Sequence, residues 1–126
     1  MQLTITVTER SPGIFTFRPV GSIDATTSSL LEEEVDSILK GSAKTMAFDM
    51  EGVNYISSAG IRVILKAQKS LTQRNGQFLM SNLQPQVKKV FEIINALPMM
   101  KVYSNMQELD RYLDAMQRKM TGEDDE

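Results

Sequence analysis

Alternation of apolar and polar residues marks the start of the chain as a β-hairpin. Over Leu3–Thr8 every second residue is apolar and the others are threonine, which is the pattern of a half-buried strand. Pro12 and Gly13 then favour a turn, and Ile14–Val20 predicts a second strand. Because Pro19 cannot donate a backbone hydrogen bond, we expect the second strand to end there or to lie at an edge.

Apolar residues at helical spacing predict four amphipathic helices after the hairpin. The first covers about residues 28–40, the second opens at two serines and stops at Asn75–Gly76, the third begins near Pro85, and the fourth follows Asn105. The side chains expected to face inward are Leu30, Leu31, Val35, Ile38 and Leu39, then Ile61, Ile64, Leu65 and Leu71, then Val87, Val90, Phe91 and Ile94, and finally Leu109, Tyr112, Leu113, Met116 and Met120.

Short apolar segments between these helices predict further strands. Thr45–Met50 lacks strict alternation, as does a strand buried on both faces, and is expected at the centre of the sheet. Gln77–Met80 and Val102–Tyr103 are shorter strand candidates, and residues 51–56 are expected to be a loop. The resulting order β-β-α-β-α-β-α-β-α predicts an α/β fold with a mainly parallel mixed sheet, an N-terminal hairpin and about four helices.

Composition and charge favour one domain. The chain has 126 residues, 41% of them hydrophobic, which suits a single core over residues 1–121 followed by an acidic, disordered tail at 122–126. The net charge is -2, but the last four residues are all acidic, so the body carries +2. A near-neutral body predicts no nucleic-acid partner. Without a signal-peptide pattern or an apolar run of about 20 residues, we expect a cytoplasmic protein that does not insert into membranes.

The residue types present restrict the chemistry that the chain can perform. It contains no histidine and no cysteine, which excludes histidine general bases, thiol nucleophiles and Cys/His zinc sites. Hydroxyls, carboxylates, lysine and arginine remain for chemistry, and we expect no cofactor or metal. A small hydrolase built on Ser57 or Ser58 would need a lysine base, and none lies in this segment. Asp24 and Asp49 could together hold a cation, but carboxylates at strand ends more often accept backbone hydrogen bonds.

The candidate site is the segment that leads from the central strand into the second helix. In open α/β sheets, ligands gather beyond the carboxyl ends of strands, where helix N-termini present free N–H groups. Here Ser57, Ser58, Ala59 and Gly60 open the helix. One serine is expected to be the N-cap, and the small residues suit close packing against the sheet. Capping does not explain why two hydroxyls stand together.

Residues 48–65, which run from Phe48 to Leu65 through this motif, resemble the signature of the anti-sigma factor antagonists of the STAS-domain family. The resemblance extends to the turn at Gly21-Ser22-Ile23-Asp24-Ala25. It also includes the segment at Leu83-Gln84-Pro85-Gln86-Val87 with Phe91 and Glu92. Coverage is essentially the whole chain, and the order of predicted elements agrees with the fold of that family.

The resemblance implies a non-enzymatic switch protein in transcription regulation and signal transduction. Unphosphorylated members bind an anti-sigma factor, a serine kinase with a histidine-kinase-like ATPase fold, and so release its target. Phosphorylation breaks this complex, and a PP2C-type phosphatase resets it. By the resemblance, Ser58 is the phosphoacceptor, Gly60 the close-packed residue and Asp24 an acidic neighbour. The family often has aspartate before the acceptor, so Ser57 stands as a rival acceptor here.

Basic residues on the second helix suggest a surface for the partner. Arg62, Lys66 and Lys69 recur at helical spacing beside the serines, and with Ser57 and Ala59 they form the expected partner-binding residues. The alternative is a solvated face that only keeps the domain soluble. A second hypothesis for the whole chain is a structural or regulatory STAS subunit of a transporter-associated or other signalling assembly, in which Ser58 only caps the helix.

Overall fold

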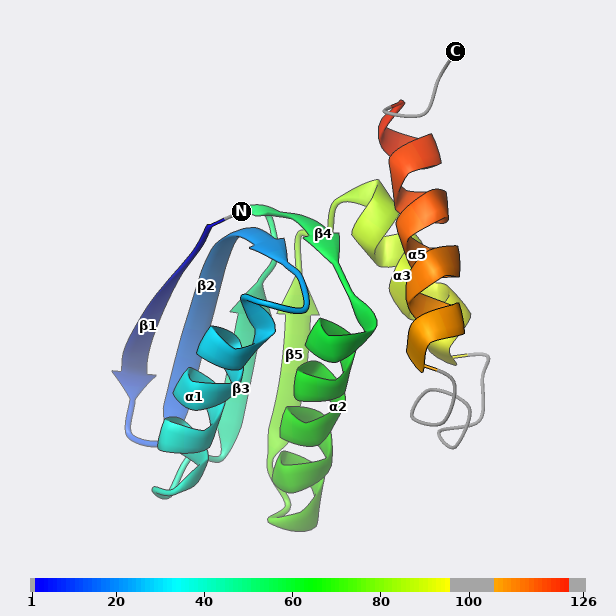
Figure 1. Ribbon diagram of the computed structural model, residues 1–126. Helices are drawn as coiled ribbons and strands as arrows, with labels where there is room; N and C mark the ends of the chain where they lie inside the picture. Colours follow the sequence, from blue (N-terminus) through cyan, green and yellow to red (C-terminus); the bar gives the residue numbers. More distant parts are fainter. Residues whose placement is uncertain (1, 96–105, 123–126) are drawn as a thin grey trace.

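A five-stranded mixed sheet organises the chain in the computed structural model, which describes residues 2–95 and 106–122 (Figure 1). Helices α1 and α2 lie side by side over one face of the sheet, and α3 and α5 pack beside β4 (Figure 1). The elements are β1 (Leu3–Ser11), β2 (Ile14–Ile23), α1 (Ser28–Leu39), β3 (Thr45–Asp49), β4 (Val53–Ile56), α2 (Ser58–Gln73), β5 (Gln77–Ser81), α3 (Pro85–Asn95) and α5 (Met106–Thr121).

Strand β2 has three neighbours. It pairs antiparallel with β1, which confirms the predicted hairpin, and parallel with both β3 and β4 on its other side. Strand β5 pairs parallel with β3, so the order is β1-β2-β3-β5, with β4 beside the second half of β2. The predicted mainly parallel mixed sheet with an N-terminal hairpin is therefore confirmed.

The prediction that the second strand ends at Pro19, or lies at an edge there, is wrong. Strand β2 continues to Ile23, and Pro19 is buried opposite Ile5 of β1. Pairing of β2 with β3 stops at Phe17, and pairing with β4 starts at Gly21. The nitrogen of Gly21 donates to Gly52 on this side, and backbone alternation places the Pro19 nitrogen on the same side. The proline therefore falls between the two parallel partners, where the ladder needs no donor.

The predicted loop at residues 51–56 contains a strand. Val53–Ile56 forms β4, in parallel register with β2 from Gly21↔Val53 to Ile23↔Ile56. Its short length and the preceding Gly52 give it the sequence character of a loop. Gly52 is needed because a Cβ there would lie 2.9 Å from Cγ2 of Val20. Pairing with β2, which lies far away in the sequence, therefore decides the conformation of this segment.

The core lies between the sheet and helices α1 and α2, and it extends to α3 and to Leu113 of α5. Met46 and Phe48 of β3 are fully buried, and the Phe48 ring stacks on Phe17 with 4.7 Å between centroids. The expectation that this strand is buried on both faces is wrong, since Ala47 is only partly buried and its register partner Leu79 is 49% exposed. The strand is nonetheless interior to the sheet, between β2 and β5.

Most of the predicted inward-facing helical residues are buried or pack on the core. Three of them are exposed instead: Leu30 at 45%, Tyr112 at 55% and Met120 at 46%. Among the described side chains of α5, Leu113 and Gln117 are buried and lie one turn apart. Tyr112 lies on a neighbouring face of the helix, and Met120 lies in the last turn, beyond Gln117.

Several predictions lie outside the described residues. These are the strand at Val102–Tyr103, the helix start at Asn105 and the tail beyond Gly122, together with the side chain of Leu109. Within the described ranges, no helix combines the length and the apolar character that a membrane span requires.

Candidate functional site

The start of α2 is fixed by Ser57. Its backbone is extended, at φ -94° and ψ 171°, and its Oγ accepts a hydrogen bond from the Gly60 N–H at 3.3 Å. The Ser57 N–H donates to the carbonyl of Ile23 at 2.8 Å, and its own carbonyl accepts from Ile61 N–H at 2.9 Å. Ser57 is therefore the N-cap, and it joins the end of β2 to the helix.

Gly60 lets α2 approach the sheet closely. A Cβ at this position would lie 2.5 Å from Cγ2 of Ile23 and 2.9 Å from Cγ1 of Ile56. Both distances are too short for carbon atoms in contact. The glycine thus holds the first turn of the helix directly against the ends of β2 and β4.

Ser58, the first residue of α2, is held by a carboxylate from the C-terminal helix. Its hydroxyl donates to Oδ1 of Asp110 at 2.6 Å, and its backbone N–H donates to the same oxygen at 2.9 Å. The Ser58 residue is fully buried. Asp110 therefore occupies the position that an anion takes at a helix N-terminus, and it contacts the hydroxyl as well.

Gln117 fastens α5 to the neighbouring strand β4. Its Oε1 accepts from the Ile56 N–H at 3.0 Å, and its Nε2 donates to the Ile56 carbonyl at 2.9 Å. The carboxamide thereby makes the two backbone hydrogen bonds that a neighbouring strand would make at the free edge of β4. Gln117 itself is only 2% exposed. Leu113, fully buried, lies between Asp110 and Gln117 on the same helical face.

Carboxylates gather around this part of the site. A cleft of ≈ 430 Å³ has Asp24, Tyr55 and Asp114 among its lining residues. Burial raises the pKa of Tyr55 to about 12, and the negative charges of Asp114, Asp110 and Asp24 add to the increase. The three carboxylates thus place negative charge near Tyr55, beside the start of α2.

Asp24 serves the start of α1. Its Oδ1 accepts from the N–H groups of Thr26 and Thr27, at 2.9 and 2.8 Å, and from the Thr27 hydroxyl at 3.1 Å. Partial burial works to raise the pKa of Asp24, but these hydrogen bonds outweigh it and hold the pKa below its ordinary value. The carboxylate that reaches Ser58 is that of Asp110 rather than that of Asp24.

Asp49 also bonds locally. It accepts from the Glu51 N–H at 3.2 Å and from the Asn82 amide at 3.2 Å, and it pairs with Arg18 at 3.4 Å. These partners lower its pKa, the Glu51 N–H most of all. Asp24 and Asp49 thus bond backbone N–H groups as expected of strand-end carboxylates. Within residues 2–95 and 106–122, no group of three or more acidic side chains is placed to hold a metal ion.

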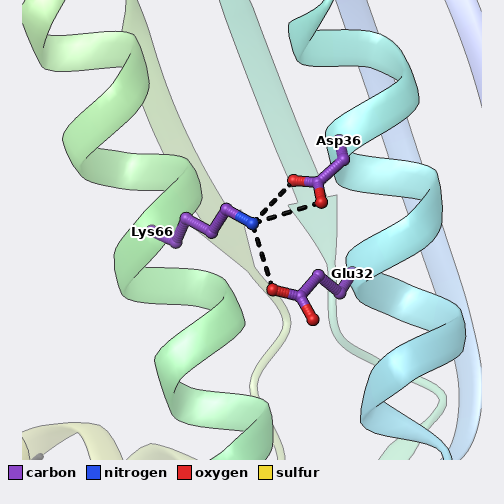
Figure 2. Close-up of polar contacts among 3 residues, drawn as sticks. All are labelled: Glu32, Asp36 and Lys66. Carbon is purple, nitrogen blue, oxygen red and sulfur yellow. Dashed lines mark hydrogen bonds and ion pairs between the residues drawn. The ribbon is translucent and has the colours of Figure 1, made fainter.

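The expected partner-binding residues of α2 line a second cleft, of ≈ 400 Å³, between α1 and α2. They are Ala59, Arg62, Lys66 and Lys69. Lys66 does not point freely into solvent, because its Nζ lies 3.0 Å from Glu32 and 2.9 Å from Asp36 of α1 (Figure 2). The hydrogen bonds to Asp36 and Glu32 raise the pKa of Lys66. Arg62 and Lys69 are exposed.

Asp110 and Gln117 are the site residues that the sequence analysis missed. They lie seven residues apart and flank Leu113, so they share its face of α5. Two polar residues within an apolar stripe were the available signal. The apolar pattern assigned the inner face to Leu109, Tyr112, Leu113, Met116 and Met120, and nothing in it says which strand or helix the polar side chains contact.

Comparisons with known proteins agree on one family. The STAS domain model matches residues 6–109. The chain is 31% identical over 87 residues to BtrV of Bordetella bronchiseptica, provisionally named an anti-sigma factor antagonist, covering 69% of this chain and 75% of that protein. It is 28% identical over 93 residues to the anti-sigma-B factor antagonist of Listeria monocytogenes, covering 74% and 82%.

Solved structures share the fold. SpoIIAA in its unphosphorylated form matches with a TM-score of 0.63 and 18% identity, over 71% of this chain and 83% of that chain. The phosphorylated form of the Bacillus cell fate determinant SpoIIAA matches with a TM-score of 0.64 and 17% identity, over 72% and 83%.

Proposed function

This chain belongs to the STAS domain family, and we propose that it is a phosphorylation-switched anti-sigma factor antagonist. Unphosphorylated, it binds an anti-sigma factor that is also a serine kinase with a histidine-kinase-like ATPase fold, and this binding releases the target of that kinase. Phosphorylation of Ser58 abolishes the complex, and a PP2C-type phosphatase restores it. The names of the Bordetella and Listeria relatives support the antagonist role, and the phosphorylated form of SpoIIAA supports the switch.

The observation that carries this proposal is the division of roles between the two serines. Ser57 caps α2 through its side chain, so the hydroxyl of Ser58 is not needed as a cap. Ser58 nevertheless stands at the first position of the helix, where added negative charge is favourable. A phosphate on Ser58 therefore leaves the cap of α2 intact, which favours Ser58 over Ser57 as the acceptor.

The switch acts at the interface rather than by unfolding the domain. A phosphoserine adds about -1.5 to -2 charges, which the N-terminus of α2 accommodates. A partner surface that fits the uncharged start of α2 would have to desolvate or repel that charge. A loss of about 3 kcal/mol at the interface lowers the affinity more than a hundredfold.

The cleft between α1 and α2 gives the partner a charged surface next to the serines. Its three cations are all exposed, but Lys66 is paired with Glu32 and Asp36, whereas no ion pair of Arg62 or Lys69 occurs among the described residues. Arg62 lies one turn from Ser58, so a partner that docks on this cleft lies next to the start of α2. We infer that Arg62 and Lys69 steer an acidic partner surface.

A structural or regulatory STAS subunit of a transporter-associated assembly is the second candidate function. The observation that favours it is the burial of Ser58, whose hydroxyl already has a structural partner in Asp110. In such a subunit the Ser58–Asp110 contact would only hold the C-terminal helix in place.

A pull-down followed by phosphorylation distinguishes the two functions. Wild-type protein and Ser58→Asp serve as baits in an extract of the source cells, and we expect an ATPase-fold kinase with wild type alone. That kinase and ATP are then incubated with wild type, Ser58→Ala and Ser57→Ala, and mass spectrometry locates the phosphate. We expect phosphorylation of wild type and Ser57→Ala only.

Two results would contradict the proposal. Undiminished phosphorylation of Ser58→Ala would remove Ser58 from the role, and a phosphate located on Ser57 would assign the role to that residue. Recovery of membrane transport components, without an ATPase-fold kinase, would favour the second candidate.

A further inference from the structure

The hydroxyl of Ser58 is closed to a kinase as long as α5 is docked. In phosphoryl transfer, Oγ of Ser58 attacks the γ-phosphorus of ATP and forms the new O–P bond. The bond to the β–γ bridging oxygen breaks, its electron pair leaves with ADP, and the hydroxyl proton passes to a base on the kinase. In this structure Ser58 is fully buried and its hydroxyl proton is donated to Asp110. The attacking oxygen cannot reach ATP in this geometry.

A phosphate on Ser58 would take the place of Asp110. One carboxylate oxygen of Asp110 accepts both the N–H and the O–H of Ser58, at 2.9 and 2.6 Å. After phosphorylation the O–H donor is gone, and the phosphate oxygens compete for the N–H. The two anions would lie within hydrogen-bond distance of each other, in a region that already holds Asp114 and Asp24.

The hold of α5 on the domain rests on few buried side chains. Among those that the structure describes in this helix, Leu113 and Gln117 are buried and Met116 is partly buried. Asp110 and Gln117 supply the polar contacts to Ser58 and Ile56. Since the loss of Asp110 removes one of these attachments directly, α5 is suited to leave without unfolding of the sheet.

We propose that α5 is a displaceable cover over Ser58, and that docking of α5 and phosphorylation of Ser58 exclude each other. The inference rests on the proposed function in taking Ser58 as the phosphoacceptor. Undocking of α5 precedes phosphoryl transfer, and the phosphate then prevents α5 from returning. By linkage, any partner that holds α5 in place disfavours phosphorylated Ser58 at equilibrium by the same factor by which the phosphate weakens the hold of that partner.

Amide hydrogen exchange on the full chain tests the cover without knowledge of the kinase. Ser58→Asp places a carboxylate against Asp110, and we expect exchange in α5 to accelerate by at least about tenfold. The double variant Ser58→Asp/Asp110→Asn removes the repulsion and should return the rate most of the way to that of wild type. The matched control is Ser28→Asp, because Ser28 is the buried first residue of α1 and its hydroxyl donates to the Ala25 carbonyl.

A second variant keeps Ser58 intact in case Ser58→Asp disturbs folding. Asp110→Ala should accelerate exchange in α5, while the peptides of β3 and the C-terminal half of α2 exchange as in wild type. Glu108→Ala removes the same charge from an exposed position in the first turn of α5 and should change the exchange of α5 much less. The same exchange in Ser58→Asp, Asp110→Ala and wild type would overturn the cover.

Phosphorylation rates separate this inference from the proposed function. With the captured kinase and ATP, we expect Asp110→Ala to be phosphorylated at Ser58 several-fold faster than wild type. Equal rates with unchanged exchange would refute the cover and leave the proposed function standing. Accelerated exchange without phosphate on Ser58 in any variant would leave the cover standing and refute Ser58 as the switch.

Discussion

At the scale of single residues, the site depends on backbone geometry that separates two neighbouring serines. Ser57 is extended and Ser58 is helical, so their side chains leave the backbone in different directions. One hydroxyl turns back to cap the Gly60 N–H, and the other meets Asp110. The roles follow from position, since the two side chains are chemically identical.

The cap is the first test at this scale. Ser57→Ala removes the oxygen that accepts the Gly60 N–H and leaves that donor unsatisfied in a buried place, so we expect a loss of about 1 kcal/mol in the free energy of unfolding. Ser57→Asp keeps an acceptor and should stay within about 0.5 kcal/mol of wild type. Urea denaturation measures both. A loss in Ser57→Asp equal to that in Ser57→Ala would contradict the capping role.

The close approach at Gly60 gives a second test. Gly60→Ala gains about 1 kcal/mol of helix propensity, but its Cβ would clash with Ile23 and Ile56, and overpacking of this kind costs about 1–3 kcal/mol. We therefore expect no gain in stability, and a net loss of up to about 2 kcal/mol by urea denaturation.

The matched control for Gly60→Ala is a glycine with room for a methyl group. At Gly41 the nearest contact of an added Cβ is the Ile38 carbonyl at 3.6 Å, an ordinary distance. Gly41→Ala should therefore be neutral or slightly stabilising. A Gly60→Ala variant as stable as Gly41→Ala would show that the sheet gives way at this point.

At the scale of elements, Lys66 joins α1 to α2 across the cleft (Figure 2). The pair of carboxylates on α1 is spaced by four residues, so Glu32 and Asp36 face the same lysine. All three side chains are between 41% and 46% exposed, so solvent screens much of the attraction. The bridge is expected to align the two helices more than to stabilise the fold.

Removal of this bridge should have a small effect that depends on salt. Lys66→Gln is expected to lose about 0.5–1 kcal/mol at low ionic strength, and most of the difference should vanish near 1 M salt. Lys69→Gln is the control, because no ion pair of Lys69 occurs in the part of the chain that the structure describes. Denaturant titrations at two salt concentrations measure both, and a salt-independent loss would point to packing of the lysine stem instead.

Glutamine side chains supply hydrogen bonds to the edge of β4 that does not pair with β2. The carbonyls of Glu51, Asn54 and Ile56 accept from the side-chain amides of Gln84, Gln86 and Gln117, at 2.7, 2.9 and 2.9 Å. The free edge of the strand is thus covered by α5 and by the segment that begins α3. No periodicity within residues 51–56 announces such partners, which is why that segment was predicted to be a loop.

At the scale of the whole molecule, the response to pH follows from which titratable groups are present. Asp24 and Asp49 have folded-state pKa values below the ordinary 3.8, so each stabilises the fold above that value and stops doing so as pH falls through its folded-state pKa. The chain has no histidine, the side chain that ordinarily titrates between pH 5 and 8.

Thermal unfolding should therefore show a plateau and an acid limb. We expect the midpoint to be nearly constant between about pH 5.5 and 8 and to fall below about pH 4. Asp24→Asn/Asp49→Asn should be less stable than wild type at neutral pH and should lose less on acidification. Parallel acid limbs for wild type and the double variant would show that other carboxyl groups control the transition.

The sequence by itself determined the hairpin, the amphipathic helices and the place where α2 begins. These features depend on apolar spacing and on cap residues that lie within about ten positions of one another. Interactions over such short distances in the sequence can be predicted from the sequence. The tertiary structure alone decided that β2 continues through Pro19, that β4 pairs with β2 and that Asp110 covers Ser58. The Ser58–Asp110 contact spans 52 residues, and which polar side chain of α5 reaches the serine depends on how that helix docks.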